Sequence, residues 1–105
     1  MKLTILERLM CLGLLPEEGN IATMRMRNAL IMKVGLSAEE IEEYQVTGLD
    51  TGAVKWVVDA PPKEVELKLP EINLIRAKLE SLEKEEKITP NHVALYGKFV
   101  DGETE

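Results

Sequence analysis

The chain has 105 residues, of which 45% are hydrophobic and 30% charged, and this is the composition of a single globular domain, not of a disordered chain. Its net charge is −6 and only four residues are aromatic, which argues against general nucleic-acid binding, because that needs a basic surface and exposed rings for base stacking. The charge is uneven, because residues 1–35 hold five basic and three acidic side chains and the remainder holds eight and sixteen. This distribution leaves room for an anion pocket in the first third and for a basic partner on the acidic part.

The cysteine content indicates the cellular compartment, since Cys11 is the only cysteine of the chain. One cysteine cannot form a disulfide within the chain, which fits a reducing environment. Residues 1–15 carry charges at Glu7 and Arg8 where a signal peptide is apolar, and no apolar run approaches the ~20 residues of a membrane span. We therefore expect a cytoplasmic protein with no membrane partner, in which Cys11 is a small buried residue.

Two helices are expected at the start of the chain. Thr4 and Glu7 have the spacing of a capping box, so the first helix is expected to begin at Thr4. Asn20 begins a second helix over about 21–34, and Gly35 is suited to end it.

A short third helix is expected next. Ser37 and Glu40 repeat the capping-box spacing, and Leu36 and Ile41 are placed to pack across that cap. This helix is expected to end near Tyr44.

The second helix carries apolar residues on two nearly opposite sides, with Ile21, Met24 and Ile31 on one and Met26, Leu30 and Val34 on the other. A helix that is apolar on two sides is usually held between two layers. In a chain this short the second layer can be another subunit, so we expect a homo-oligomer, most simply a dimer, with Met24, Met26 and Leu30 at its interface.

The middle of the chain changes to a period of two, which is typical of strands with one buried face. Residues 53–59 alternate, and so do residues 64–69, with the sequence APPK between them. This pattern predicts an antiparallel hairpin. A third strand over 45–49, before a turn at 49–52, is left open.

Two helices are expected to close the chain. Pro70 suits the first turn of a helix whose apolar stripe is Ile72, Ile75, Leu79 and Leu82. A last helix begins at Thr89-Pro90 and is expected to bury Val93, Tyr96, Phe99 and Val100. The predicted fold is therefore one α+β domain over 1–100, with three N-terminal helices, a central two- or three-stranded antiparallel meander, two C-terminal helices and a frayed tail at 101–105.

The search for catalytic or metal-binding patterns finds little. The glycines form no phosphate-binding loop, and one cysteine with one histidine cannot supply the usual zinc ligands. His92 is the only side chain that ordinarily titrates near neutral pH, but no nucleophile accompanies it, so we interpret it as a surface or capping residue. We expect no enzymatic activity, no cofactor and no metal, although carboxylates alone could still hold Mg²⁺ or Ca²⁺.

Four cations in the first third, Arg8, Arg25, Arg27 and Lys33, are the candidates for an anion site. Arginine binds phosphate through two parallel hydrogen bonds, and these side chains could converge at a subunit boundary. The simpler interpretation is that they extend from a crowded helix into water.

Two acidic runs admit two interpretations. Glu39-Glu40 with Glu42-Glu43, and Glu83 with Glu85-Glu86, are either solvated helix faces or surfaces that mimic nucleic acid and occupy a basic groove on a partner. The helix dipole explains the first run, which follows the cap at Ser37, but it disfavours the second run near a helix C-terminus. Glu83, Glu85 and Glu86 are therefore the acidic interface candidates.

Residues 1–9 (MKLTILERL), 13–20 (GLLPEEGN) and 92–100 (HVALYGKFV) together resemble a family of small uncharacterised proteins, about 100 residues long, of tailed bacteriophages and prophages. The resemblance implies a bacterial host cytoplasm during infection or lysogeny, and an accessory protein that binds something of the host's. The leading expectation is a non-catalytic protein that binds a host protein as an inhibitor or counter-defence module. The alternative is an oligomer that sequesters an anionic nucleotide signal.

Overall fold

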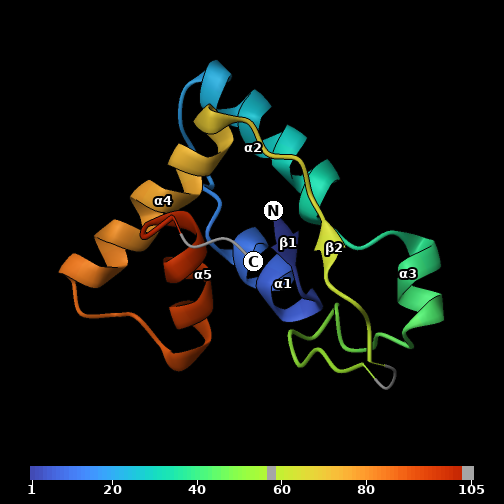
Figure 1. The fold of residues 1–105 in the computed structure, drawn as a ribbon. Helices are drawn as coiled ribbons and strands as arrows, with labels where there is room; N and C mark the ends of the chain where they lie inside the picture. The colour runs from blue at the N-terminus through green and yellow to red at the C-terminus, as the bar shows by residue number, and fades with distance from the viewer. Residues whose placement is uncertain (57–58, 103–105) are drawn as a thin grey trace.

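A computed structural model describes residues 1–56 and 59–102, and helices take up more than half of them (Figure 1). In chain order the elements are β1 (Lys2–Leu3), α1 (Ile5–Gly13), α2 (Ile21–Val34), α3 (Ala38–Glu43), β2 (Lys63–Glu64), α4 (Leu69–Lys84), the 3-10 helix η1 (Pro90–His92) and α5 (Val93–Phe99). Within the described part of the chain, every helix is too short or too polar to cross a membrane.

The capping residues place the first three helices where the sequence predicts them. Thr4 Oγ1 accepts a hydrogen bond from the Glu7 backbone N–H at 3.2 Å, and the Glu7 carboxylate accepts one from the Thr4 N–H at 2.9 Å. Asn20 caps α2 by accepting a hydrogen bond from the Thr23 N–H at 2.8 Å. Ser37 forms a second capping box at the start of α3. These side chains satisfy N–H groups that would otherwise lack partners in the first helical turn.

The predicted α+β fold with a central meander is wrong, because the described residues are mostly helical and form only a very small sheet. The sheet has two strands of two residues each, and β2 pairs antiparallel with β1 at the start of the chain, not with residues 53–59. Val65 is buried and Leu67 half-buried, as the alternation over 64–69 predicts, but Leu69 is 68% exposed at the start of α4, and the segment packs beside Met1 and β1. Three N-terminal residues are too few to show a period, so the sequence gives no sign of this pairing.

In place of the predicted strands over 45–49 and 53–59, the described residues form a single backbone bridge. Thr47 and Lys55 exchange two backbone hydrogen bonds, of 2.8 and 2.9 Å, and so close a turn that contains Gly48 and Gly52. Residues 57–58 lie outside the described residues. The turn connects α3 to the extended chain that leads into β2 (Figure 1).

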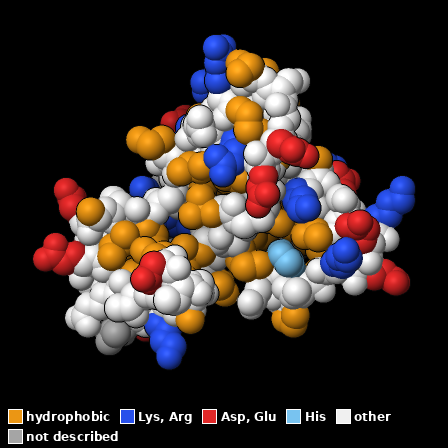
Figure 2. Space-filling model, turned by 180° about the vertical axis from the view of Figure 1, so that it is seen from behind, with side chains coloured by type: hydrophobic (Ala, Val, Ile, Leu, Met, Phe, Trp, Pro, Cys, Tyr) orange, Lys and Arg blue, Asp and Glu red, His pale blue; other side chains and the backbone are white. Residues whose placement is uncertain are grey.

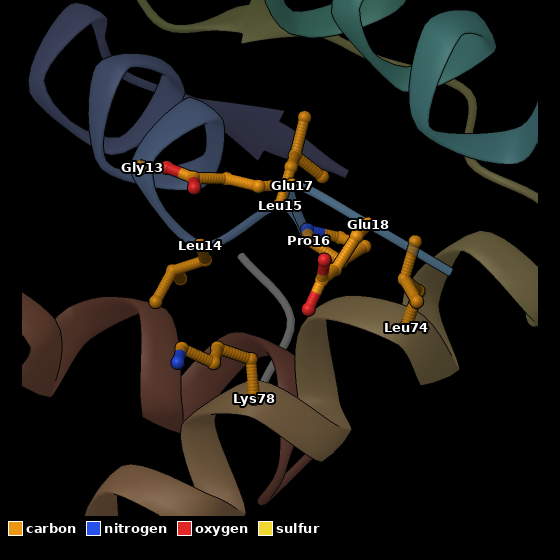
Figure 3. Close-up of a pocket in the computed structure, with 8 residues that line it drawn as sticks. All are labelled: Gly13, Leu14, Leu15, Pro16, Glu17, Glu18, Leu74 and Lys78. Atoms are coloured by element: carbon orange, nitrogen blue, oxygen red, sulfur yellow. The ribbon is translucent and has the colours of Figure 1, made fainter. Parts of the chain in front are cut away.

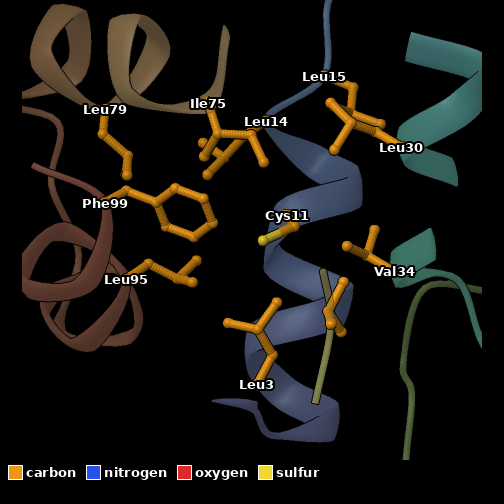
Figure 4. Packing of buried hydrophobic residues seen from close by; sticks show 11 residues of the cluster. Leu3, Cys11, Leu14, Leu15, Leu30, Val34, Ile75, Leu79, Leu95 and Phe99 are labelled. Atoms are coloured by element: carbon orange, nitrogen blue, oxygen red, sulfur yellow. The ribbon is translucent and has the colours of Figure 1, made fainter. Parts of the chain in front are cut away.

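The hydrophobic core surrounds α1, as Figure 4 shows. Cys11 projects from α1 between two groups of side chains, one from α4 and α5 and the other from α2. The fully buried core residues are Leu3, Cys11, Leu30, Val34, Ile75, Leu79 and Leu95. Burial of a large aliphatic side chain contributes about 1.5–3 kcal/mol, so this cluster is a main source of stability for the packing of α1, α2, α4 and α5.

Helix α2 packs against two other helices of the same chain. It contacts α1 and α4, and Leu30 and Val34 are completely buried. Leu30 is therefore not on a surface that a second copy could touch. The large apolar residues of α2 that stay exposed are Ile21 and Met32, at 65% and 84%. Self-association remains a prediction.

The two C-terminal helices follow the sequence with one correction. Ile75 and Leu79 are completely buried, while Ile72 and Leu82 pack against the core from the edge, as the predicted stripe requires. In α5 the prediction that Val93 is buried is wrong, because it is 62% exposed and Leu95 occupies the core. The predicted tail at 101–105 lies outside the described residues from position 103 onward.

Gly48 and Gly52 provide a matched test of the turn. Both have a positive φ, of 82° and 83°, but a Cβ at Gly48 would collide with the carbonyl group of Ala53, whereas a Cβ at Gly52 meets no atom within 4 Å. We expect Gly52→Ala to lose about 1 kcal/mol of stability through its backbone conformation, and Gly48→Ala to lose clearly more. Urea unfolding followed by the fluorescence of Trp56 checks this; equal losses would contradict the described turn.

Candidate functional site

Arg8 is buried, at 2% exposure, and its guanidinium group has partners in two other helices. Its Nε donates to the Val34 carbonyl at 2.9 Å and its Nη2 to the Gly35 carbonyl at 2.7 Å, at the C-terminal end of α2. Nη1 and Nη2 also bind the two carboxylate oxygens of Glu40 in α3, at 2.7 and 2.9 Å. Arg8 therefore joins α1 to the end of α2 and to α3, instead of facing solvent.

The four predicted anion-binding cations are divided between separate tasks. Lys33 Nζ lies 2.6 Å from Glu71 Oε1 and connects α2 to α4. Arg25 is exposed, while Arg27 is half-buried and its Nε has no hydrogen-bond partner among the described residues. Because Arg8 and Lys33 already pair with carboxylates of this chain, the structure does not offer a shared anion pocket formed by all four cations.

A third ion pair shows that these contacts follow one pattern. Lys98 Nζ in α5 lies 2.9 Å from Glu7 Oε1, and that carboxylate also caps α1 at Thr4. Glu7, Glu40 and Glu71 are each the third residue of a helix, and each accepts a backbone hydrogen bond at the start of its own helix. Each also binds a cation from a different helix. One carboxylate thus performs two functions, a local cap and a connection between helices.

Two of these glutamates have shifted pKa values. The hydrogen bonds from Arg8 hold the pKa of Glu40 at about 2, although partial burial opposes the shift. Burial of Glu71 raises its pKa, but the hydrogen bonds from Lys33 and from the Lys68 backbone outweigh that effect and lower it. Both carboxylates are therefore charged at neutral pH and stabilise the fold instead of exchanging protons with a substrate.

Cys11 and His92 carry side chains that often act in catalysis, but in this fold both have structural roles. Burial raises the pKa of the Cys11 thiol to about 12, so the thiolate needed for nucleophilic attack does not form at neutral pH. His92 Nδ1 lies 3.0 Å from both the backbone N and the Oγ1 of Thr89, which places it in the cap of η1. This contact supports the interpretation of His92 as a capping residue.

The predicted interface residues have different exposures. Met24 and Met26 are half-buried on α2 and Leu30 is in the core. Glu83, Glu85 and Glu86 are exposed at the C-terminal end of α4, where Glu86 has a positive φ of 57°. The acidic run at the end of α4 is therefore available to solvent, as the sequence predicts.

A second group of apolar side chains lies outside the core around α1. We call residues 36–56 the α3 corner; it comprises α3 and the turn after it, and it forms one corner of the molecule in Figure 1. Val46 is buried there, Leu49 is 44% exposed, and the half-buried apolar residues are Leu36, Ile41, Tyr44, Val54 and Trp56. None of these belongs to the main core cluster. Figure 2 shows hydrophobic side chains gathered on this side, at the left of the view.

The sequence does not point to this surface. The alternation over 53–59 predicts a hairpin there, and Ile41 is predicted to pack across the α3 cap. The signal that could have found it is the length of the connection between α3 and β2, because a long connection in a compact domain is often functional.

Two open hollows lie elsewhere on the surface. The first, of about 570 Å³, is lined by Leu14, Leu15, Pro16 and Leu74 with Glu17, Glu18 and Lys78 at its rim (Figure 3). The second, of about 520 Å³, lies between α2 and the segment 63–68 and is lined by Met32, Lys33 and the residues of that segment. Neither joins a nucleophile to a general base, and the described residues contain no group of three or more histidine, cysteine or acidic side chains placed to hold a metal ion.

Comparisons with protein-family models, with curated proteins and with solved structures find no match to this chain.

The low pKa of Glu40 predicts an acid-sensitive contact. Its folded-state value of about 2 is below the ordinary 4.5, so its contribution is complete above pH 4.5 and is lost as the pH falls toward 2. We expect the stability difference between the wild type and Glu40→Gln to be largest near pH 5 and to shrink toward pH 2, as measured by urea unfolding. Glu42→Gln, on an exposed residue of the same helix, is the control and should lose little at pH 5. A difference that does not change with pH would contradict the Arg8–Glu40 contact.

Proposed function

We propose that this protein is a non-catalytic interaction module that binds another protein. The observation that carries the proposal is the α3 corner, where aliphatic and aromatic side chains stay partly exposed outside the main core. The corner includes Trp56, the only tryptophan of the chain. Partly exposed tryptophan and tyrosine side chains are characteristic of the centres of protein interfaces, where they contribute most of the binding energy.

The environments of the reactive side chains support a non-catalytic role. Cys11 is a protonated thiol in the core, and His92 caps η1. The buried Arg8 and the half-buried Lys33 and Lys98 bind carboxylates that also cap helices. These groups are used to hold the fold together, which leaves surface recognition as the activity that the chain supports best.

The resemblance to small phage and prophage proteins bears on the partner. If the chain acts in that setting, the partner is a protein of the bacterial cytoplasm, and the effect of binding is inhibition or counter-defence. The nucleotide-sequestering alternative has less support, because Arg8 and Lys33 are paired within the chain and do not form a common pocket with Arg25 and Arg27.

Affinity capture from a bacterial lysate, followed by native mass spectrometry of the eluted species, tests the proposal. We expect a defined complex of the chain with one protein, which re-forms when the two purified proteins are mixed. Complexes that contain only additional mass in the nucleotide range would favour the alternative. Elution of the chain with no protein above a bait-free control would contradict the proposed function.

A further inference from the structure

The α3 corner combines an apolar centre with an acidic edge. Residues 36–56 contain five carboxylates and a single lysine. Glu40 is directed toward Arg8, whereas Glu39, Glu42, Glu43 and Asp50 are exposed. In Figure 2, acidic side chains lie at the border of the hydrophobic group on this side of the molecule. An apolar centre with a charged edge is the usual arrangement of a protein-binding surface.

The backbone of the corner is held by hydrogen bonds within the chain. The Val46 N–H donates to the Ile41 carbonyl at 2.9 Å, and Thr47 and Lys55 exchange two backbone hydrogen bonds. Arg8 holds the start of α3 through Glu40. A surface that is already ordered loses less conformational entropy on binding, so its apolar contacts contribute more to affinity.

The charge of the corner selects among possible occupants. Nucleic acid and anionic membranes carry the same sign of charge as Glu39, Glu42 and Glu43 and are repelled. A second copy that docked corner to corner would place the same carboxylates opposite one another, because a two-fold interface uses one surface twice. A protein segment with an apolar stripe and flanking lysine or arginine residues matches both the centre and the edge.

We propose that the α3 corner docks a basic amphipathic segment of a partner protein. The apolar stripe of that segment contacts Ile41, Leu49 and Trp56, and its cations face the exposed carboxylates of α3. This inference rests on the proposed function, and it specifies the surface and the chemical class of the partner.

The sole tryptophan provides a direct readout. We would titrate the whole protein with a synthetic amphipathic Leu/Lys helix that contains no aromatic residue, and follow the emission of Trp56 and its quenching by acrylamide. The control peptide is a Leu/Glu helix with the same apolar stripe. We expect the Leu/Lys peptide to shift the emission to shorter wavelength and to protect Trp56 from quenching, and the Leu/Glu peptide to do neither. Binding without a change at Trp56 would overturn the proposal, and so would equal binding of the two peptides.

Two triple variants separate local docking from net charge. Glu39→Gln/Glu42→Gln/Glu43→Gln and Glu83→Gln/Glu85→Gln/Glu86→Gln each remove three exposed carboxylates, from α3 and from the end of α4. We expect the first to weaken Leu/Lys binding severalfold, because three exposed ion pairs are lost, and the second to leave it nearly unchanged. Circular dichroism checks that both stay folded. Equal weakening in both variants would show a net-charge effect and overturn the proposal.

The same variants distinguish the failure of this inference from the failure of the proposed function. If a captured partner binds the wild type and the α3 variant equally well, the interaction module stands and the α3 corner is not its docking surface. If no protein partner is captured, the proposed function fails whatever the peptides do.

Discussion

A buried guanidinium group needs hydrogen-bond acceptors inside the protein, and those of Arg8 determine how the end of α2 and the start of α3 lie against α1. The Val34 and Gly35 carbonyls come from the end of α2, where backbone acceptors lack helical partners, and Glu40 comes from the first turn of α3. The α3 corner contributes no residue to the core around α1. Its orientation relative to that core therefore depends on a polar contact and not mainly on burial.

The sequence predicts the helices well because their signals are local. Capping boxes at Thr4 and Ser37 and the proline at position 70 mark helix starts that the structure confirms. The strands were mispredicted because their pairing is not local: the alternation over 64–69 indicates a buried face, but it cannot show that the partner is the N-terminal end of the chain. The segment 53–59 also pairs with no strand among the described residues. Its backbone pairing there is the single bridge between Thr47 and Lys55.

The candidate site could be predicted only in part. The positive charge of the first third of the chain identifies Arg8 and Lys33 as candidate site residues, but it does not show that Glu40, predicted to cap α3, and Glu71 are their partners. That second use of a capping glutamate requires two helices to meet, which depends on the whole fold. The partly exposed apolar surface of the α3 corner cannot be predicted for the same reason. In a sequence, an apolar residue that will be half-exposed cannot be distinguished from one that will be buried, and only the fold shows that the main core contains no residue of the corner.

The central claim is that Arg8 holds the α3 corner against a core that is otherwise independent of it, and hydrogen–deuterium exchange by mass spectrometry tests it most directly. In Arg8→Met, which keeps an unbranched apolar side chain but removes the guanidinium group, faster exchange is expected in residues 38–56, including the amides of Val46 and Lys55, while α4 and α5 keep their wild-type protection. Equal acceleration in α4 and α5, or unchanged exchange in the corner, would contradict this account.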